Sequence, residues 1–533
     1  MTFNYKRAIK IIKSEEYRGN NPVPDILGLS HLYALYGNED KLYKILDGLI
    51  DQYSVAMMPQ PLLKIDVPKP NFTIRPMSRP ENKDWILFET LVSWIAEKII
   101  QKENICKRSF SYLNFLPETE KDNNWVKFDD KGRALFTSGY KYVVVADLTG
   151  YYENISLSEL KKRIINYLDA NEENSKNVDI LCRMLNKWSD ERVTGYGLPQ
   201  GPPASSFLAD IYLDLVDCKM ERYEHYFRYM DDIKIFCKTE IEAKKGLKDL
   251  TIALRGIKLN INAKKTEILY EATAEKRLFD PLKSSLNLIA AIFKKKDIDQ
   301  IKAVIPSLTQ IFEGAFLNDP FEKSHFNFSL YRLSTLQSSG LPIDSAKILS
   351  LIRDNFVAKP HHTGLFCFFL TLFPNDKSIS DFLVTFLRSE QNIYDWQEVK
   401  ILQSLLKFNV KMDASQISFI VNSARDSNKH YAARAFYIMI IGKYGSNRDR
   451  ELIVDHYDNS FHDYVKTAAI LAVQELGQAS RNDFYARIKQ HEGDNEITNF
   501  INYVKSLRHP LYYLDSPRSK IEAVEEAEPQ PYF

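Results

Sequence analysis

The sequence predicts an α+β domain followed by an all-α domain of helical repeats and a short acidic tail. Segments rich in β-branched residues alternate with helical patterns over residues 1–285, whereas strand signals and glycines become scarce over residues 286–510. After Lys520 the chain carries four glutamates, two prolines and no basic residue. We therefore expect two folded domains with these boundaries and a flexible tail at residues 511–533.

The composition is that of an ordinary globular protein. The chain has 533 residues, of which 44% are hydrophobic and 26% charged, and its net charge is +1. Nucleic acid is therefore not indicated by overall charge, and binding it would require local clusters. The longest apolar stretch, Leu365 to Phe373, is far shorter than the roughly 20 residues that span a membrane. With scattered cysteines and no signal-peptide pattern, this predicts a cytoplasmic protein without a membrane segment.

The first predicted elements lead to a buried strand. Residues 66–79 are rich in proline and favour an extended loop or ribbon, and residues 85–100 carry apolar side chains at helical spacing. Residues 141–148 (KYVVVADL) are dominated by β-branched side chains, which is typical of a buried strand. A helix that begins with a capping box is predicted over residues 156–169.

The following elements extend the predicted sheet. A helix over residues 207–223 is entered through two prolines, which helices tolerate near their first turn. Residues 226–238 predict a hairpin, and residues 259–270 are expected to continue the sheet.

The helical region shows a loose repeat. Residues 431–445 and 464–477 are apolar helical segments that each end in glycine and lie about 33 residues apart. This period predicts stacked two-helix repeats of the HEAT type.

Three aspartates form the candidate catalytic group. Asp147 ends the strand over 141–148, and Asp231 and Asp232 lie between two short strands 84 residues later. Each alone is an ordinary turn residue, but adjacent strands would bring all three carboxylates to one edge of the sheet. Repulsion between them calls for hard divalent cations, Mg²⁺ first. Two such ions ~3.5–4 Å apart would clamp the oxygens of a phosphoryl displacement, so the predicted reaction class is nucleotidyl transfer.

The order of these segments resembles the palm motifs of reverse transcriptases. The matching pieces are the strand aspartate, the GLPQG loop at 197–201, the YMDD hairpin and the lysine-bearing strand at 256–269. The resemblance implies a right-hand polymerase palm with fingers, in which Asp147 and Asp231 hold two Mg²⁺ ions. Asp232 would be a weaker ligand.

The same resemblance implies roles for residues around the aspartates. Tyr152 falls at the position of an aromatic gate that would collide with the 2′-hydroxyl of a ribonucleotide. Gln200 and Gly201 would line the nascent base pair. Lys265 would donate a proton to pyrophosphate, with Lys264 as the alternative.

Residues 67–80 resemble the fingers segment that grips the incoming dNTP. Lys69 and Arg75 match its basic positions, and the arginine fork suits a triphosphate. The alternative is a proline-rich surface loop with incidental charges.

A palm followed by more than two hundred helical residues resembles the bacterial abortive-infection and defence-associated reverse transcriptases. This implies an RNA-directed DNA polymerase acting in anti-phage defence, a homo-oligomer, and in some members a partner non-coding RNA or a protein primer. Tyr532 on the tail is the priming candidate, with Tyr5 and Tyr17 as alternatives. The tail could equally be a solubilising segment with an idle tyrosine.

Two other functions remain open. One is a template-independent nucleotidyltransferase or an RNA polymerase on the same palm, although Tyr152 argues against ribonucleotides. The other is a non-catalytic helical scaffold with a dead palm, against which the three intact aspartates argue. The methionine in YMDD and the two prolines after GLPQG depart from the commonest bacterial pattern, but neither removes a metal ligand.

Overall fold

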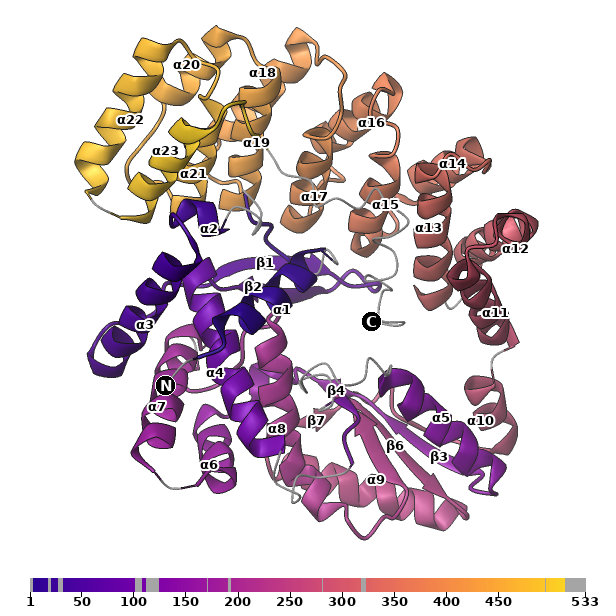
Figure 1. The fold of residues 1–533 in the computed structure, drawn as a ribbon. Helices are drawn as coiled ribbons and strands as arrows, with labels where there is room; N and C mark the ends of the chain where they lie inside the picture. The colour runs from indigo at the N-terminus through magenta and orange to yellow at the C-terminus, as the bar shows by residue number, and fades with distance from the viewer. Residues whose placement is uncertain are drawn as a thin grey trace. The chain divides into compact units, whose positions relative to one another are not determined.

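The computed structural model describes residues 3–17, 21–26, 32–100, 108–111, 124–169, 171–189, 193–279, 281–317, 323–493 and 495–512. Figure 1 shows these residues in chain order. They form two compact units that are not contiguous in sequence. Unit 1 draws on Met1–Ser14, Ile45–Leu63 and Ser78–Leu288, and unit 2 on Glu15–Lys44, Lys64–Met77 and Ile289–Phe533.

Unit 1 is built around a four-stranded antiparallel sheet. Its strands lie in the order β5 (Tyr226–Tyr229), β6 (Asp232–Cys237), β3 (Tyr142–Ala146) and β8 (Glu267–Leu269). A short second pair joins β4 (Leu148–Thr149) to β7 (Asn260–Ile261). The predicted buried strand, hairpin and sheet extension are therefore confirmed.

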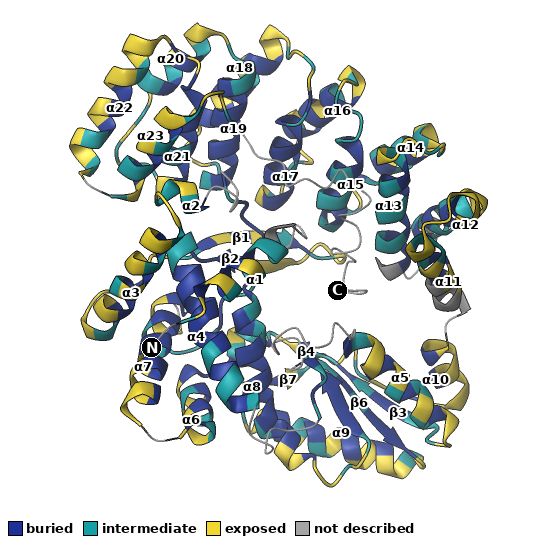
Figure 2. Cartoon of the chain, in the orientation of Figure 1, coloured by how far each residue is buried: buried dark blue, intermediate teal, exposed yellow. Residues whose placement is uncertain are grey.

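Helices cover both faces of this sheet. Gly132 of α5 (Asn124–Thr137) lies against the ring of Phe236, and Gly246 of α9 (Glu240–Arg255) lies against Ile235. Because neighbouring side chains on a strand point to opposite faces, α5 and α9 pack on opposite sides. Figure 2 shows the sheet as a buried layer. Because both faces are covered, polar side chains that could react with a substrate lie at the ends of the strands.

A buried helix, α8, is the packing centre for several other helices of the N-terminal half. Pro202 and Pro203 stand at its first turn, as the sequence predicts. Helix α8 contacts α4, α6 and α9, and α7 packs on α4 and α6. The bounds of these helices are α1 (Tyr5–Tyr17), α2 (Leu32–Leu35), α3 (Glu39–Val55), α4 (Asn82–Ile100), η3 (Tyr152–Asn154), α6 (Leu157–Tyr167), α7 (Glu172–Trp188), α8 (Pro203–Lys219) and α10 (Glu271–Leu278).

A two-stranded ribbon precedes α4. Strands β1 (Leu63–Pro68) and β2 (Ile74–Arg79) pair with each other, which confirms the extended ribbon expected over 66–79. Most of this ribbon, Lys64–Met77, clusters with unit 2 rather than with the sheet.

Unit 2 is a row of helices. Contacts run from α13 to α15, α17, α19, α21 and α23 in turn, and the helices between them line the other side of the row. The region is helical as predicted, whereas its assignment to HEAT repeats stays a prediction. The bounds are α11 (Pro281–Lys295), α12 (Ile298–Leu317), α13 (Lys323–Ser338), α14 (Ser345–Asn355), η4 (Pro360–His362), α15 (Thr363–Leu370), α16 (Lys377–Arg388), α17 (Asp395–Leu405), α18 (Ala414–Arg425), α19 (Tyr431–Tyr444), α20 (Asn447–Asp455), α21 (Asp463–Ala472), α22 (Gln478–Glu492) and α23 (Glu496–Ser506).

The two predicted glycine stops have different outcomes. Helix α19 ends just before Gly445, as expected. Helix α21 ends at Ala472, and Gly477 instead precedes α22, so the prediction that Gly477 stops α21 is wrong. Among the described residues, none of the helices is long and apolar enough to cross a membrane.

The close approach of α19 and α21 generates a stability prediction. A Cβ on Gly442 would lie 2.6 Å from the Cα and 2.8 Å from the carbonyl oxygen of Ala472. Because backbone must move to accept it, we expect Gly442→Ala to destabilise the protein by about 1–3 kcal/mol, measured by urea unfolding with hydrogen exchange of α19.

Gly314 provides the matched control for this substitution. It lies within α12, and a Cβ there would meet none of the described atoms within 4 Å. Gly314→Ala should be neutral or stabilising by up to about 1 kcal/mol. Equal behaviour of the two variants would contradict the close packing of α19 on α21.

Candidate active site

The three predicted carboxylates meet at one end of the four-stranded sheet. Ala146 pairs with Ile233, so the next residues along their strands, Asp147 and Asp232, lie at the same end. Asp231 stands in the turn just before β6. Burial raises the pKa of Asp231 to about 7, and repulsion from Asp232 and then Asp147 adds to the shift. The carboxylates are therefore close enough to oppose one another's ionisation.

Asp147 is fixed by the turn that follows β7. The Asn262 side chain donates to Asp147 Oδ2 at 3.0 Å, and the Asn262 backbone N–H donates to the Asp147 carbonyl at 2.8 Å. The Lys265 ammonium lies 3.2 Å from Asp147 Oδ2 and is largely exposed. Lys264 is also exposed, and its backbone N–H donates to Asn262. The geometry thus brings Lys265 to the carboxylates, while the choice between the two lysines as proton donor stays a prediction.

The donor set fits hard cations but is not a finished metal cage. Within the described residues, no three His, Cys, Asp or Glu side chains form a ready-made metal-binding group. Mg²⁺ is commonly held by one or two carboxylates together with waters and substrate phosphates, so such a cage is not required. The mutual repulsion that raises the pKa of Asp231 would be relieved by a bound cation. On these grounds the aspartates fit Mg²⁺.

The GLPQG loop and the Tyr152 segment are joined by backbone hydrogen bonds. Leu198 N–H donates to the Tyr152 carbonyl at 3.0 Å, and Gly197 N–H donates to the Ile155 carbonyl at 2.9 Å. The Tyr152 hydroxyl lies 3.1 Å from Ser206 Oγ on α8. Gly201 has a φ of +144°, a conformation that favours glycine. These contacts place the predicted gate and the predicted base-pair loop in one cluster.

Gln200 is anchored by its backbone and has an unsatisfied side chain. Its carbonyl accepts the Ser78 N–H at 2.7 Å at the end of β2. Its buried Oε1 has no hydrogen-bond partner among the described residues. A buried polar atom of this kind calls for an explanation, and a ligand provides one.

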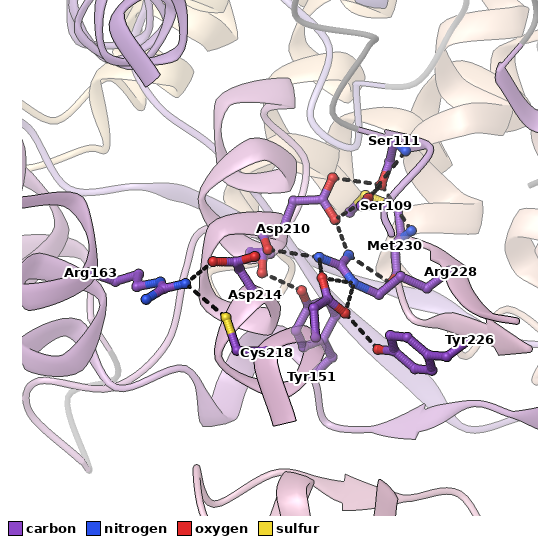
Figure 3. Close-up of polar contacts among 12 residues, drawn as sticks. Ser109, Ser111, Tyr151, Arg163, Asp210, Asp214, Cys218, Tyr226, Arg228 and Met230 are labelled. Carbon is purple, nitrogen blue, oxygen red and sulfur yellow. Dashed lines mark hydrogen bonds and ion pairs between the residues drawn. The ribbon is translucent and has the colours of Figure 1, made fainter. Parts of the chain in front are cut away.

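A buried ion network behind the YMDD turn is not predicted from the sequence. The guanidinium of Arg228, fully buried, binds Asp217 through Nε and Nη2 at 2.8–3.0 Å and pairs with Asp210. Tyr226 donates to Asp217 at 2.6 Å, and Ser111 donates to Asp210 at 2.6 Å. Figure 3 shows the side chains of Asp210, Ser111 and Arg228 converging from α8, the segment at 108–111 and β5.

This network holds the turn that carries Asp231. Met230 has a φ of +53°, an unusual value for a residue with a side chain. Its N–H donates to Ser111 Oγ at 3.0 Å, and its carbonyl accepts from Arg228 Nη1 at 3.3 Å. Both polar groups of the strained residue are thus fixed by the network, which sets the position of the next residue, Asp231.

A sequence signal for the network existed. Asp210, Asp214 and Asp217 repeat on the apolar helix α8, and Arg228 directly precedes the YMDD motif. Buried carboxylates require a paired cation, so this pattern indicated a charged partner without identifying it.

The remaining predicted residues lie in unit 2, outside the described residues or elsewhere in unit 1. Lys69 and Arg75 lie on the part of the ribbon that belongs to unit 2, and their binding role stays a prediction. Tyr532 and the Tyr17 side chain lie outside the described residues. Tyr5 is buried and donates to Asp47 at 2.6 Å, so it does not suit the mobile arm that priming needs.

Comparison with known proteins gives a family match for this region. Residues 67–301 match the family model of reverse transcriptases (RNA-dependent DNA polymerases). The sheet, the three aspartates and the GLPQG loop all lie within the matched residues. No curated protein matches the chain. The match supports nucleotidyl transfer of the reverse-transcriptase type, with binding of nucleotides and nucleic acid.

The buried ion network around Arg228 gives a second prediction. Arg228→Met would leave Asp210 and Asp217 buried without their cation, so we expect a loss of about 3–5 kcal/mol in denaturant unfolding. Arg133→Met is the control, because Arg133 is partly exposed and pairs with Asp129 at 3.0 Å along helix α5. Its loss should be under about 1 kcal/mol. Similar losses in both variants would contradict the special cost of the buried site.

Proposed function

We propose that the chain is a Mg²⁺-dependent DNA polymerase of the reverse-transcriptase type, which adds dNTPs to a hydroxyl group. The observation that carries the proposal is the convergence of Asp147, Asp231 and Asp232 at one end of the sheet in a domain that matches reverse transcriptases. The three carboxylates supply the oxygen donors that this reaction requires.

The three aspartates have different roles in the proposed metal site. Asp147 and Asp231 bind the two ions, and Asp232, whose pKa is raised by burial and by Asp147, is the weaker ligand. The bound Mg²⁺ ions would activate the attacking hydroxyl and neutralise the leaving pyrophosphate. Lys265, whose ammonium lies 3.2 Å from Asp147 Oδ2, gives a proton to pyrophosphate.

Substrate selection is assigned to the cluster of Tyr152 and the GLPQG loop. The hydrogen bond to Ser206 fixes the direction of the Tyr152 ring, as a steric gate against the 2′-hydroxyl requires. Gln200 and Gly201 line the nascent base pair, supported by the unsatisfied Gln200 Oε1 and the open glycine backbone. Lys69 and Arg75 bind the triphosphate.

The proposed biological role follows from the order of the domains. The long helical unit after the palm supports membership of the defence-associated group, with anti-phage activity, homo-oligomerisation, a cytoplasmic location and a partner non-coding RNA. Sequencing of the RNA and DNA that copurify with the protein tests the partner. Priming from Tyr532 is tested by protein-bound label from dNTPs, which Tyr532→Phe should abolish.

The first functional prediction removes the metal ligands. Asp147→Asn, or Asp231→Asn with Asp232→Asn, should reduce Mg²⁺-dependent dNTP incorporation to background, because a lost ligand removes charge stabilisation from the reacting phosphate. Incorporation is measured with labelled dNTPs, and circular dichroism checks the fold. Asp249→Asn on α9 is the control, since this aspartate binds Tyr223 and Arg222 away from the turn. Normal incorporation by the Asn variants would refute the site.

The second functional prediction changes the gate. Tyr152→Ala should admit ribonucleotides while dNTP use falls only modestly, because exclusion by a ring is steric. Tyr152→Phe keeps the ring and should retain the preference for dNTPs. Competition between labelled dNTP and rNTP measures the ratio, and an unchanged ratio in Tyr152→Ala would place the gate elsewhere.

A further inference from the structure

The ribbon that carries Lys69 and Arg75 belongs to the helical unit. Its residues Lys64–Met77 cluster with unit 2, although the ribbon lies more than two hundred residues before most of that unit in sequence. Two-stranded ribbons are marginally stable in water by themselves. The contacts that hold this ribbon therefore determine how well its basic side chains are ordered.

The first attachment is at the base of β1. The Lys64 N–H donates to the Tyr431 hydroxyl at 2.8 Å, and that hydroxyl donates back to the Lys64 carbonyl at 3.1 Å. His430 Nε2 also lies 2.9 Å from the Lys64 carbonyl. Because His430 Nδ1 accepts the Ala432 N–H, its Nε2 carries the proton and donates. Both backbone polar groups of Lys64 are thus bound by the start of α19.

The second attachment is at the turn of the ribbon. The Tyr394 hydroxyl, just before α17, donates to the Phe72 carbonyl at 3.0 Å. Phe72 has a φ of +62°, so the turn is held in a conformation that a residue with a side chain seldom adopts. Lys69 closes this turn by donating its N–H to the Thr73 carbonyl at 2.7 Å.

The two attachments come from adjacent, buried helices. Helices α17 and α19 pack against each other, and the Tyr431 ring stacks on His462 at the start of α21 with centroids 4.3 Å apart. In Figure 1 the ends of α17 and α19 face β1 and β2. A ribbon that is bound at its base and at its turn by two helices packed on each other has little freedom to move relative to those helices.

We propose that unit 2 orders the nucleotide-binding ribbon, with Tyr394 and Tyr431 as positioning residues that set dNTP affinity. The inference rests on the proposed function for the role of Lys69 and Arg75, but the attachment itself does not. A basic group ordered before the triphosphate arrives avoids the entropy cost of ordering on binding. Loss of the attachments should therefore raise KM for dNTPs and leave kcat nearly unchanged.

The test is the double variant Tyr394→Phe, Tyr431→Phe in the full chain. Each change removes one hydroxyl and keeps the ring that packs. We expect faster amide exchange over residues 64–77. We also expect a rise in KM of about 3- to 30-fold, because part of the free energy of the three lost hydrogen bonds is then spent on ordering the ribbon when dNTP binds. The kcat should change less than about 2-fold.

Tyr444→Phe is the matched control. The Tyr444 hydroxyl donates to the Leu405 and Phe408 carbonyls inside unit 2, away from the ribbon. This variant loses hydrogen bonds of the same kind and should leave both ribbon exchange and KM at the wild-type values.

The outcomes separate the two ideas. Unchanged exchange at 64–77 overturns the proposed attachment. Faster exchange with an unchanged KM overturns the proposed control of dNTP affinity, while loss of activity in Asp147→Asn would still support the catalytic site. A wild-type protein without any incorporation would refute the proposed function, and the exchange measurement would then overturn or uphold the attachment alone.

Discussion

The buried guanidinium of Arg228 is the interaction on which the candidate active site depends. It is the cation that faces two fully buried carboxylates, Asp210 and Asp217, and it also binds the carbonyl of Met230. Desolvation makes such a cluster costly unless its hydrogen bonds are nearly complete. Here the same bonds also hold a strained turn. The free energy that would otherwise favour relaxation of Met230 is opposed by the cost of separating buried charges.

The site contains two groups of carboxylates whose charges are compensated in different ways. Asp210 and Asp217 face Arg228 and are closed off from solvent, so their charges are compensated inside the fold. Asp147, Asp231 and Asp232 face one another, with the exposed Lys265 as a nearby cation. Burial, and then repulsion from Asp232 and Asp147, raise the pKa of Asp231 to about 7. Strand β5 and its turn link the two groups, because they carry both Arg228, the partner of the first group, and Asp231 of the second.

Local signals in the sequence predicted the elements but not their partners. The valine-rich strand, the proline-entered helix and the YMDD hairpin follow from periodicity and turn chemistry, and the structure confirms each. The prediction that Gly477 ends helix α21 is wrong, because α21 ends at Ala472 and Gly477 is the N-cap of α22. The link between Arg228 and Asp210 could not be predicted, because pairing across 18 residues depends on how a helix packs behind a hairpin.

The same limit applies to the ribbon, whose sequence predicts an extended segment but not the unit that holds it. Segments before the palm complete unit 2. Tyr464 of α21 donates to the Pro24 carbonyl, Tyr36 donates to Glu496, and Tyr431 binds Lys64. Each bond joins residues more than 360 positions apart, so local periodicity contains no trace of them. Val23, Ile26 and Leu32 are buried, and they lie in the early segment that belongs to unit 2. The helices after residue 286 therefore do not form this unit alone. The two units are therefore interleaved in sequence, and the ribbon with its two basic residues is one of the early segments that belong to unit 2.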